Sequence, residues 1–235
     1  MSLPKINYPI FEVVIPSSKQ KVKMRPFLVK EEKILLTAQT TGNTRDVVLA
    51  IKQVVNNCLI DAIDVDRLAT FDLEYLFIKL RGRSINNVID VTYHDPDDEQ
   101  DYKLQIDLDK VEIINNPEHS SNIKINDQLG LVLRYPKTDM LKAVEQASSE
   151  VDLYFEVIKY CIDKVYDENE VYDTKDYTDE ELVEFITSLD VSTFKEIQKF
   201  LETMPKLHYE TSYTNSAGVE KKVVLQNLND FFILG

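Results

Sequence analysis

The chain has 235 residues, of which 43% are hydrophobic and 29% charged, a composition typical of a folded protein rather than a disordered one. Its formal net charge of −14, from 27 Lys and Arg against 41 Asp and Glu, argues against nucleic acid and anionic membranes as partners. With only 5 glycines, the chain contains neither of the glycine-rich phosphate-binding patterns, GxxxxGK(S/T) and GxGxxG.

Cysteine usage and the N-terminus favour a cytoplasmic setting. Cys58 and Cys161 lie far apart, each within an apolar helical pattern. They are predicted to be small buried hydrophobic residues rather than a disulfide or a pair of metal ligands. Residues 1–5 lack the apolar stretch of a signal peptide, and no apolar run approaches the roughly 18 residues that span a bilayer. We therefore expect the protein to be made and used in a cytoplasm.

The first elements expected along the chain are a β-hairpin and a short helix. Strand-forming residues over 8–29 flank a turn cluster at 16–19, which predicts the hairpin. Pro26 cannot donate to a strand ladder, so it marks a strand end. Residues 30–39 then predict a short helix that stops at Gly42.

Two further helices and a β-rich segment are expected next. Apolar residues recur at intervals of three and four from about residue 44 to 60, which predicts the first helix. Thr70 or Asp72 is expected to cap the second. The following segment predicts a hairpin with a long acidic tip at 94–101. The stretches with β character in this segment are 88–93, 102–108, 111–114, 123–125 and 129–135.

The last third is predicted to be mainly helical. Helix is expected again from about residue 139, and an apolar stripe with helical spacing runs from Val151 to Val165. Two capping boxes then predict the starts of two helices, Thr178 with Glu181 and Thr193 with Glu196. A hairpin over 208–225 and an amphipathic tail at 228–234 complete the chain.

These elements predict an α+β protein, in which β-hairpins are combined with segregated groups of helices. Neither a Rossmann pattern nor a barrel pattern is present. We expect two regions. Residues 1–137 would form an N-terminal α+β region with the first hairpin, helices and the central hairpin. Residues 138–235 would form a C-terminal helical region with the terminal hairpin.

Residues that carry chemistry are scattered. His94, His119 and His208 each stand next to turn residues, with no Cys or His at metal-ligand spacing. The acidic tip at 94–101 meets a calcium-loop spacing only in part, because Gln100 stands where that loop has glycine. A solvated hairpin tip is the simpler interpretation. No catalytic, cofactor-binding or metal-binding residue is predicted, and a hydrolase-like site built from acidic loops and His119 is kept as the alternative.

Three surfaces are candidates for contacts with other proteins. Lys21, Lys23 and Arg25 occupy alternate positions of a predicted strand and form a small basic strip. Residues 167–184 contain nine acids and one base, which indicates a solvated face or a docking patch for a basic partner. The apolar C-terminus either packs on its own domain or inserts into a partner. Its candidate contact residues are Phe231, Phe232 and Leu234.

Several segments, in order along the chain, resemble the baseplate hub proteins of T4-type contractile-tailed phages. The likeness is clearest at residues 25–33, where the strand pattern changes into a helix pattern. None of these segments is a catalytic motif, so the specificity of the resemblance comes from their number and order. They are residues 3–9, 25–33, 51–58, 71–77, 117–119, 135–136 and 228–232.

The resemblance implies a role in building the baseplate hub, as a subunit or as an assembly chaperone, without a reaction or a cofactor. Its implied partners are other tail and hub proteins, with a second copy of this chain as a further candidate. The implied location is the host cytoplasm during assembly and the tail baseplate of the virion. Some relatives have paired cysteines in the central and C-terminal hairpins, similar to zinc-ribbon knuckles. Here the tips at 95–98 and 215–218 have none, so packing alone is expected to hold them.

Overall fold

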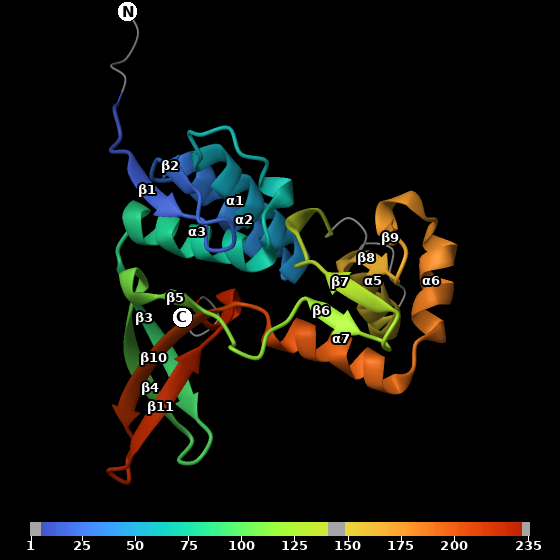
Figure 1. The fold of residues 1–235 in the computed structure, drawn as a ribbon. Coiled ribbons are helices and arrows are strands. Elements are labelled where there is room, and N and C mark those ends of the chain that lie inside the picture. Colours follow the sequence, from blue (N-terminus) through green and yellow to red (C-terminus); the bar gives the residue numbers. More distant parts are fainter. Residues whose placement is uncertain (1–5, 141–148, 232–235) are drawn as a thin grey trace, which may run out of the picture. The chain divides into compact units, whose positions relative to one another are not determined.

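The computed structural model describes residues 6–140 and 149–231, and the fold is a mixed α+β arrangement with several small antiparallel sheets (Figure 1). The chain divides into two compact units. One contains the described residues up to Ile114 and from Lys206 onward, and the other is Asn115–Pro205. These units differ from the two regions expected from the sequence, because the C-terminal hairpin joins the N-terminal part of the chain.

The first unit begins with the predicted hairpin. Strands β1 (Phe11–Val14) and β2 (Lys21–Met24) pair antiparallel, with Val13 opposite Val22. Alternate residues of the hairpin face the core, as expected for a sheet with one buried face. The turn is fixed by Asp72, whose carboxylate accepts hydrogen bonds from the amide of Ser17 at 2.9 Å and from its hydroxyl at 2.5 Å.

Three helices pack with this hairpin: α1 (Val29–Thr41), α2 (Thr44–Cys58) and α3 (Thr70–Ser84). Gly42 ends α1 with a left-handed φ of 65°, which confirms the predicted stop and needs a residue without a Cβ penalty. The cap predicted for α3 is wrong. Ala69 precedes this helix and makes no side-chain cap, and Asp72 instead holds the turn of the first hairpin. A short 3₁₀ turn, η1 (Val65–Arg67), precedes α3.

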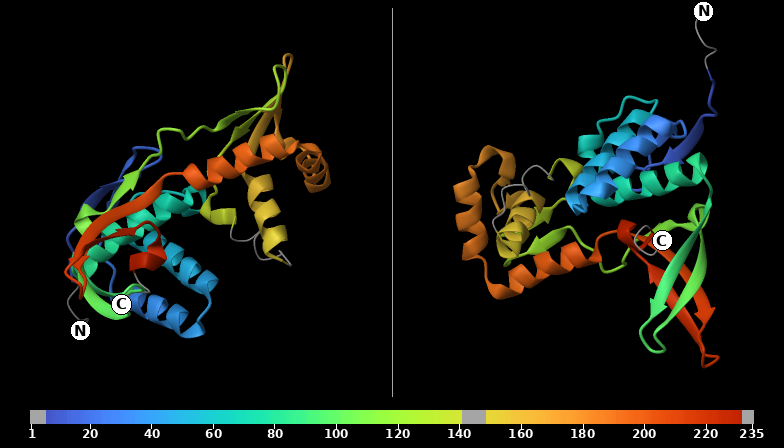
Figure 2. Two further views of the ribbon diagram at one scale, coloured as in Figure 1. Left: turned by 90° about the horizontal axis from the view of Figure 1, so that it is seen from below. Right: turned by 180° about the vertical axis from the view of Figure 1, so that it is seen from behind.

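The rest of the first unit is β-structure. Strands β3 (Val88–Asp95) and β4 (Gln100–Asp107) form the central hairpin. Strand β5 (Glu112–Ile114) follows the 3₁₀ turn η2 (Leu108–Lys110) and pairs with β10 (Lys206–Thr214), which pairs in turn with β11 (Glu220–Leu225). The central and C-terminal β-segments therefore share a sheet, of order β11-β10-β5. In Figures 1 and 2 the two long hairpins lie side by side.

The second unit is built on a four-stranded antiparallel sheet of order β6-β7-β8-β9. Helix α5 is followed directly by β8, and helices α6 and α7 follow β9. The strands are β6 (Asn122–Lys124), β7 (Gly130–Leu133), β8 (Ile162–Tyr166) and β9 (Val171–Asp173). The helices are α5 (Glu150–Cys161), α6 (Asp179–Ser188) and α7 (Val191–Thr203). Short 3₁₀ turns occur at η3 (Thr138–Met140) and η4 (Thr174–Asp176).

Two expectations in this unit are corrected. The apolar stripe that predicts helix as far as Val165 ends as helix at Cys161, because the next five residues pair with β7. Long-range pairing decides this segment, since three- and four-residue spacing alone allows either structure. The capping box of Thr178 and Glu181 is confirmed, with both reciprocal hydrogen bonds present. The second one is wrong, because Asp190 caps α7.

Each unit has its own hydrophobic core. Cys58 lies in the first core and Cys161 in the second, both fully buried and free, which confirms the sequence prediction for them. Burial raises the pKa of the Cys58 thiol to about 11 and that of Cys161 to about 12. Neither thiol is therefore poised as a nucleophile near neutral pH.

Candidate functional site

The basic strip predicted on the first hairpin is reduced to two lysines. Lys21 and Lys23 are exposed on β2, while the residues between and after them are buried. Arg25 instead folds back onto its own unit. Its guanidinium binds the Glu31 carboxylate at 3.0 Å and the carbonyl oxygens of Pro26 and Asn57 at 2.9 and 2.8 Å. Arg25 is therefore engaged within its own unit, and its role as a partner contact stays a prediction.

The Arg25–Glu31 pair locks the junction between β2 and α1. The Glu31 side chain is 0% exposed and also accepts the backbone N–H of Leu28 at 2.9 Å, at the start of the helix. Burial by itself raises the pKa of Glu31. The hydrogen bonds from Arg25 and Leu28 outweigh it and hold this pKa below its usual value. This junction lies in residues 25–33, the segment in which the phage-protein resemblance is clearest.

The C-terminal tail docks on its own unit as far as the structure describes it. Phe231, at the end of the 3₁₀ turn η5 (Leu228–Phe231), is 2% exposed and belongs to the first core. This burial favours packing on its own unit, while its role as a partner contact stays a prediction. Phe232 and Leu234 lie outside the described residues.

Glu74 on α3 faces the charge of Asp230 in η5. Burial, with a contribution from Asp230, raises the pKa of Glu74 to about 7. Since the folded state holds this proton more tightly than the unfolded state, stability falls as the pH rises from about 4.5 to about 7.

We expect the Glu74→Gln variant to be more stable than the wild type at pH 8, by about 1–2 kcal/mol, and of similar stability at pH 4.5. Urea unfolding at the two pH values measures the difference. The exposed Glu12→Gln variant serves as the control and leaves the pH profile unchanged. Identical pH profiles for wild type and Glu74→Gln would contradict the assignment.

Polar contacts join the tips of the central and C-terminal hairpins. The Asp98 carboxylate accepts the amide and hydroxyl of Ser216 at 3.0 and 2.8 Å, and the hydroxyl of Tyr102 at 2.6 Å. Lys221 pairs with Asp97. The Tyr102 and Tyr213 rings pack with their centroids 4.4 Å apart. The expectation that packing alone holds these hairpins is therefore wrong, and we call these contacts the hairpin clasp.

The hairpin clasp predicts a pH dependence and also the effect of replacing Asp98. The hydrogen bond from Tyr102, with those from Ser216, lowers the pKa of Asp98 to about 2. The clasp is therefore complete above about pH 4 and weakens as the pH falls through about 2. We expect Asp98→Asn to speed hydrogen exchange of the Ser216 amide at neutral pH, while Asp127→Asn, in an exposed loop, leaves it unchanged. Unaltered exchange in Asp98→Asn would show that the clasp does not hold the tips.

The carboxylates of the acidic tip do not converge on a cation. Asp95 is 2% exposed and accepts the Asp97 amide, while Asp97 and Asp98 are engaged in the clasp. The expectation of a wholly solvated tip is therefore corrected for Asp95. Within residues 6–140 and 149–231, no group of three or more His, Cys, Asp or Glu residues is arranged to hold a metal ion.

His119 lies in an aromatic environment. Its ring stacks on Tyr135 and Phe200, with centroid distances of 5.5 and 4.9 Å, and its Nδ1 lies 2.9 Å from the Thr203 hydroxyl. Burial lowers the pKa of His119. No carboxylate is among these contacts, so the arrangement does not favour the hydrolase-like alternative.

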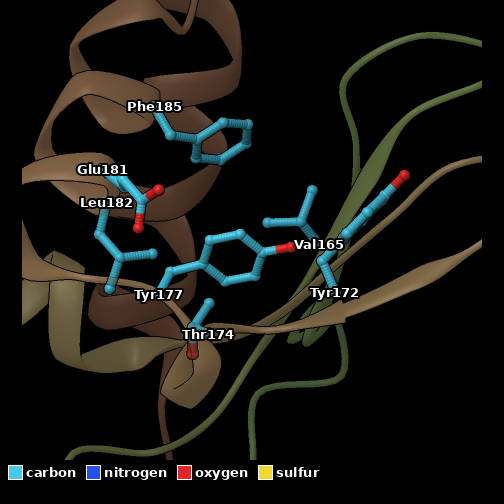
Figure 3. Close-up of a pocket in the computed structure, with 7 residues that line it drawn as sticks. All are labelled: Val165, Tyr172, Thr174, Tyr177, Glu181, Leu182 and Phe185. Carbon is cyan, nitrogen blue, oxygen red and sulfur yellow. The ribbon is translucent and has the colours of Figure 1, made fainter.

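A pocket of about 300 Å³ opens in the second unit, and we call it the α6 pocket (Figure 3). Strands β8 and β9 form one side of it, and η4 and α6 form the other. The apolar side chains in Figure 3 flank the Tyr177 ring, and Glu181 lies beside them. The residues that line it are Val165, Tyr172, Thr174, Tyr177, Leu182 and Phe185, with Glu181.

The α6 pocket was not predicted from the sequence. Leu182 and Phe185 fit the stripe of a core-facing helix, and Tyr177 lies within the acidic run. An exposed aromatic residue inside a run of acids is the signal that could have indicated the site.

A family model described as T4 bacteriophage base plate protein matches residues 8–233, nearly the whole chain. The chain therefore belongs to this base plate family. No curated protein and no solved structure matches it. In the part of the chain that the structure describes, no helix is both long and apolar enough to cross a membrane.

The segments that carry the resemblance to base plate proteins are mainly structural. Arg25 and Glu31 lock the first junction, and Asp72 holds the first hairpin turn. Four apolar residues of the 71–77 segment are buried in α3, namely Phe71, Leu73, Leu76 and Phe77. These residues stabilise the fold of this chain, so candidate partner contacts are sought on its exposed surfaces.

Proposed function

We propose that this chain is a non-enzymatic component of a contractile-tail baseplate hub and acts through contacts with other tail proteins. The observation that carries this proposal is the base plate family match over residues 8–233. The environment of His119 and the engaged carboxylates of the acidic tip add support, because neither offers converging reactive groups.

The surfaces available for such contacts differ in chemistry. Lys21 and Lys23 are exposed on one face of β2, where Glu12 lies opposite Lys23. The acidic run at 167–184 and the α6 pocket present an acidic and apolar face in the second unit. Complementary charge on neighbouring subunits steers association and fixes its register. A second copy of this chain is a further candidate for contacts with Lys21 and Lys23.

Co-expression with the other tail proteins of the same phage tests the proposal. The tagged chain is expected to copurify with at least one hub protein as a complex of defined stoichiometry. Recovery of the chain alone, from cells in which every hub protein is present and folded, would contradict it.

The composition of the finished particle distinguishes a permanent subunit from an assembly chaperone. We expect the chain in the host cytoplasm during assembly in either case. Quantitative mass spectrometry of purified virions detects a subunit at a fixed ratio to other baseplate proteins. A chaperone is absent from virions but present in baseplate intermediates.

A further inference from the structure

We propose that the α6 pocket binds a short basic segment of another tail protein, with one apolar or aromatic side chain of that segment inserted beside Tyr177 and Phe185. This assignment rests on the proposed function, since it takes the partner to be a tail protein. It adds the place of contact and the chemistry of the partner.

The lining of the pocket favours an apolar anchor. Three of its polar side chains already have partners within the fold. The Thr174 hydroxyl donates to the Ile162 carbonyl at 2.7 Å, the Tyr172 hydroxyl donates to Asp167 at 2.8 Å, and Glu181 accepts the Thr178 amide at 2.8 Å. The surface that remains for an occupant is mainly apolar and aromatic. The pocket volume of about 300 Å³ lies near the lower end of the range for binding pockets.

Three exposed apolar residues lie in the same stretch of sequence as the pocket lining. Tyr177 is 42% exposed although its ring lines the pocket, and it meets the Tyr172 ring edge-on at 6.5 Å. Val171 on β9 and Val183 on α6 are also exposed. Half-exposed aromatic residues of this kind supply large contact areas at interfaces, because they lose little conformational freedom on binding.

The negative charge around the pocket favours a positively charged occupant. Nine acids and one base lie in residues 167–184. Lys175 and Lys159 pair with Asp173 and Asp179. Among the described residues, no ion pair with Lys or Arg involves five other acids of this run, namely Glu168, Glu170, Asp176, Glu180 and Glu184. An apolar anchor flanked by lysines or arginines satisfies both the pocket and this charge, whereas a second copy of a chain of net charge −14 does not.

A peptide titration of the full chain, followed by heteronuclear NMR, tests the inference. The probe is a short synthetic peptide with a central phenylalanine flanked on both sides by lysines. The matched probes carry serine in the centre or glutamates at the flanks. The protein variants are Tyr177→Ser, which removes a half-exposed ring, and the double variant Glu180→Gln/Glu184→Gln. The control is Glu196→Gln, which removes an exposed charge from α7 outside the pocket lining.

We expect saturable shifts of the amides around Tyr177 and Phe185 with the lysine–phenylalanine peptide, which weaken at high salt. Affinity falls at least tenfold in Tyr177→Ser and about threefold in the double variant, and stays unchanged in Glu196→Gln. Absence of saturable shifts, or equal binding of the glutamate-flanked peptide, overturns the inference. So does undiminished binding by Tyr177→Ser.

Copurification with hub proteins distinguishes a failure of this inference from a failure of the proposed function. If the wild-type chain and Tyr177→Ser capture the same hub protein equally, the pocket inference fails and the proposed function stands. If neither captures a tail protein, the proposed function fails, and the peptide titration still decides whether the pocket recognises a basic segment.

Discussion

Replacing Arg25 by methionine is expected to destabilise the first unit by about 3 kcal/mol. The Glu31 carboxylate is 0% exposed, and Arg25 donates to it at 3.0 Å. Without this guanidinium, the buried carboxylate keeps only the exposed Lys30 ammonium at 3.5 Å as a cationic partner, which costs far more than the loss of a surface pair. In the variant the pKa of Glu31 rises above its usual value, so the destabilisation is larger at pH 8 than at pH 5. Urea unfolding at both pH values measures it.

Two control variants distinguish the effect of the buried charge from the effect of losing the arginine side chain. The double variant Arg25→Met/Glu31→Gln is expected to recover most of the stability, because a glutamine is neutral and can still accept the Leu28 amide. Lys23→Met, at an exposed position of the same hairpin, changes the stability by less than about 0.5 kcal/mol. A loss below about 1 kcal/mol in Arg25→Met would mean that the pair behaves as an ordinary surface salt bridge.

Replacing Phe231 by alanine is expected to cost about 3–5 kcal/mol of unfolding free energy. The side chain is 2% exposed and lies in the core of the first unit, so its removal leaves a cavity that the surrounding side chains fill only in part. The change in unfolding free energy is measured by chemical denaturation.

The alternative to packing makes a different prediction for the same variant. If Phe231 inserted into a partner instead, Phe231→Ala would leave the stability within about 0.5 kcal/mol and weaken hub-protein binding. Phe231→Leu keeps most of the buried volume and is expected to lie between wild type and alanine. Val224→Ala, on the exposed side of β11, serves as the neutral control.

Local sequence signals predicted much of the fold. The first hairpin, the three helices of the first unit and the start of α6 all depend on contacts between residues close in the sequence. Gly42 and the capping box at Thr178 are examples in which one or two residues determine an element boundary.

Long-range pairing was not accessible from the same signals. Strand β8 continues the apolar spacing of the helix before it, and its pairing with β7 and β9 makes it a strand. The pairing of β5 with β10 joins residues about ninety positions apart and places the C-terminal hairpin in the first unit. No local pattern records such a partner, because β-propensity reflects the surroundings of a strand more than its own sequence.

The candidate site was predicted only in part. The alternating lysines of β2 indicated an exposed basic strip on one face of the strand. The same alternation included Arg25, whose partner Glu31 lies beyond Pro26 in the following helix. The acidic run was recognised, whereas the pocket within it was not, since it requires β8, β9 and α6 to come together.

The most direct test of a role in baseplate assembly is electron microscopy of particles from host cells infected with a phage that lacks this chain. We predict tails without complete baseplates, or free sub-assemblies that stop before the hub is finished, and restoration when the chain is supplied in trans. Complete baseplates and infectious particles formed at the normal yield without the chain would contradict the role proposed here.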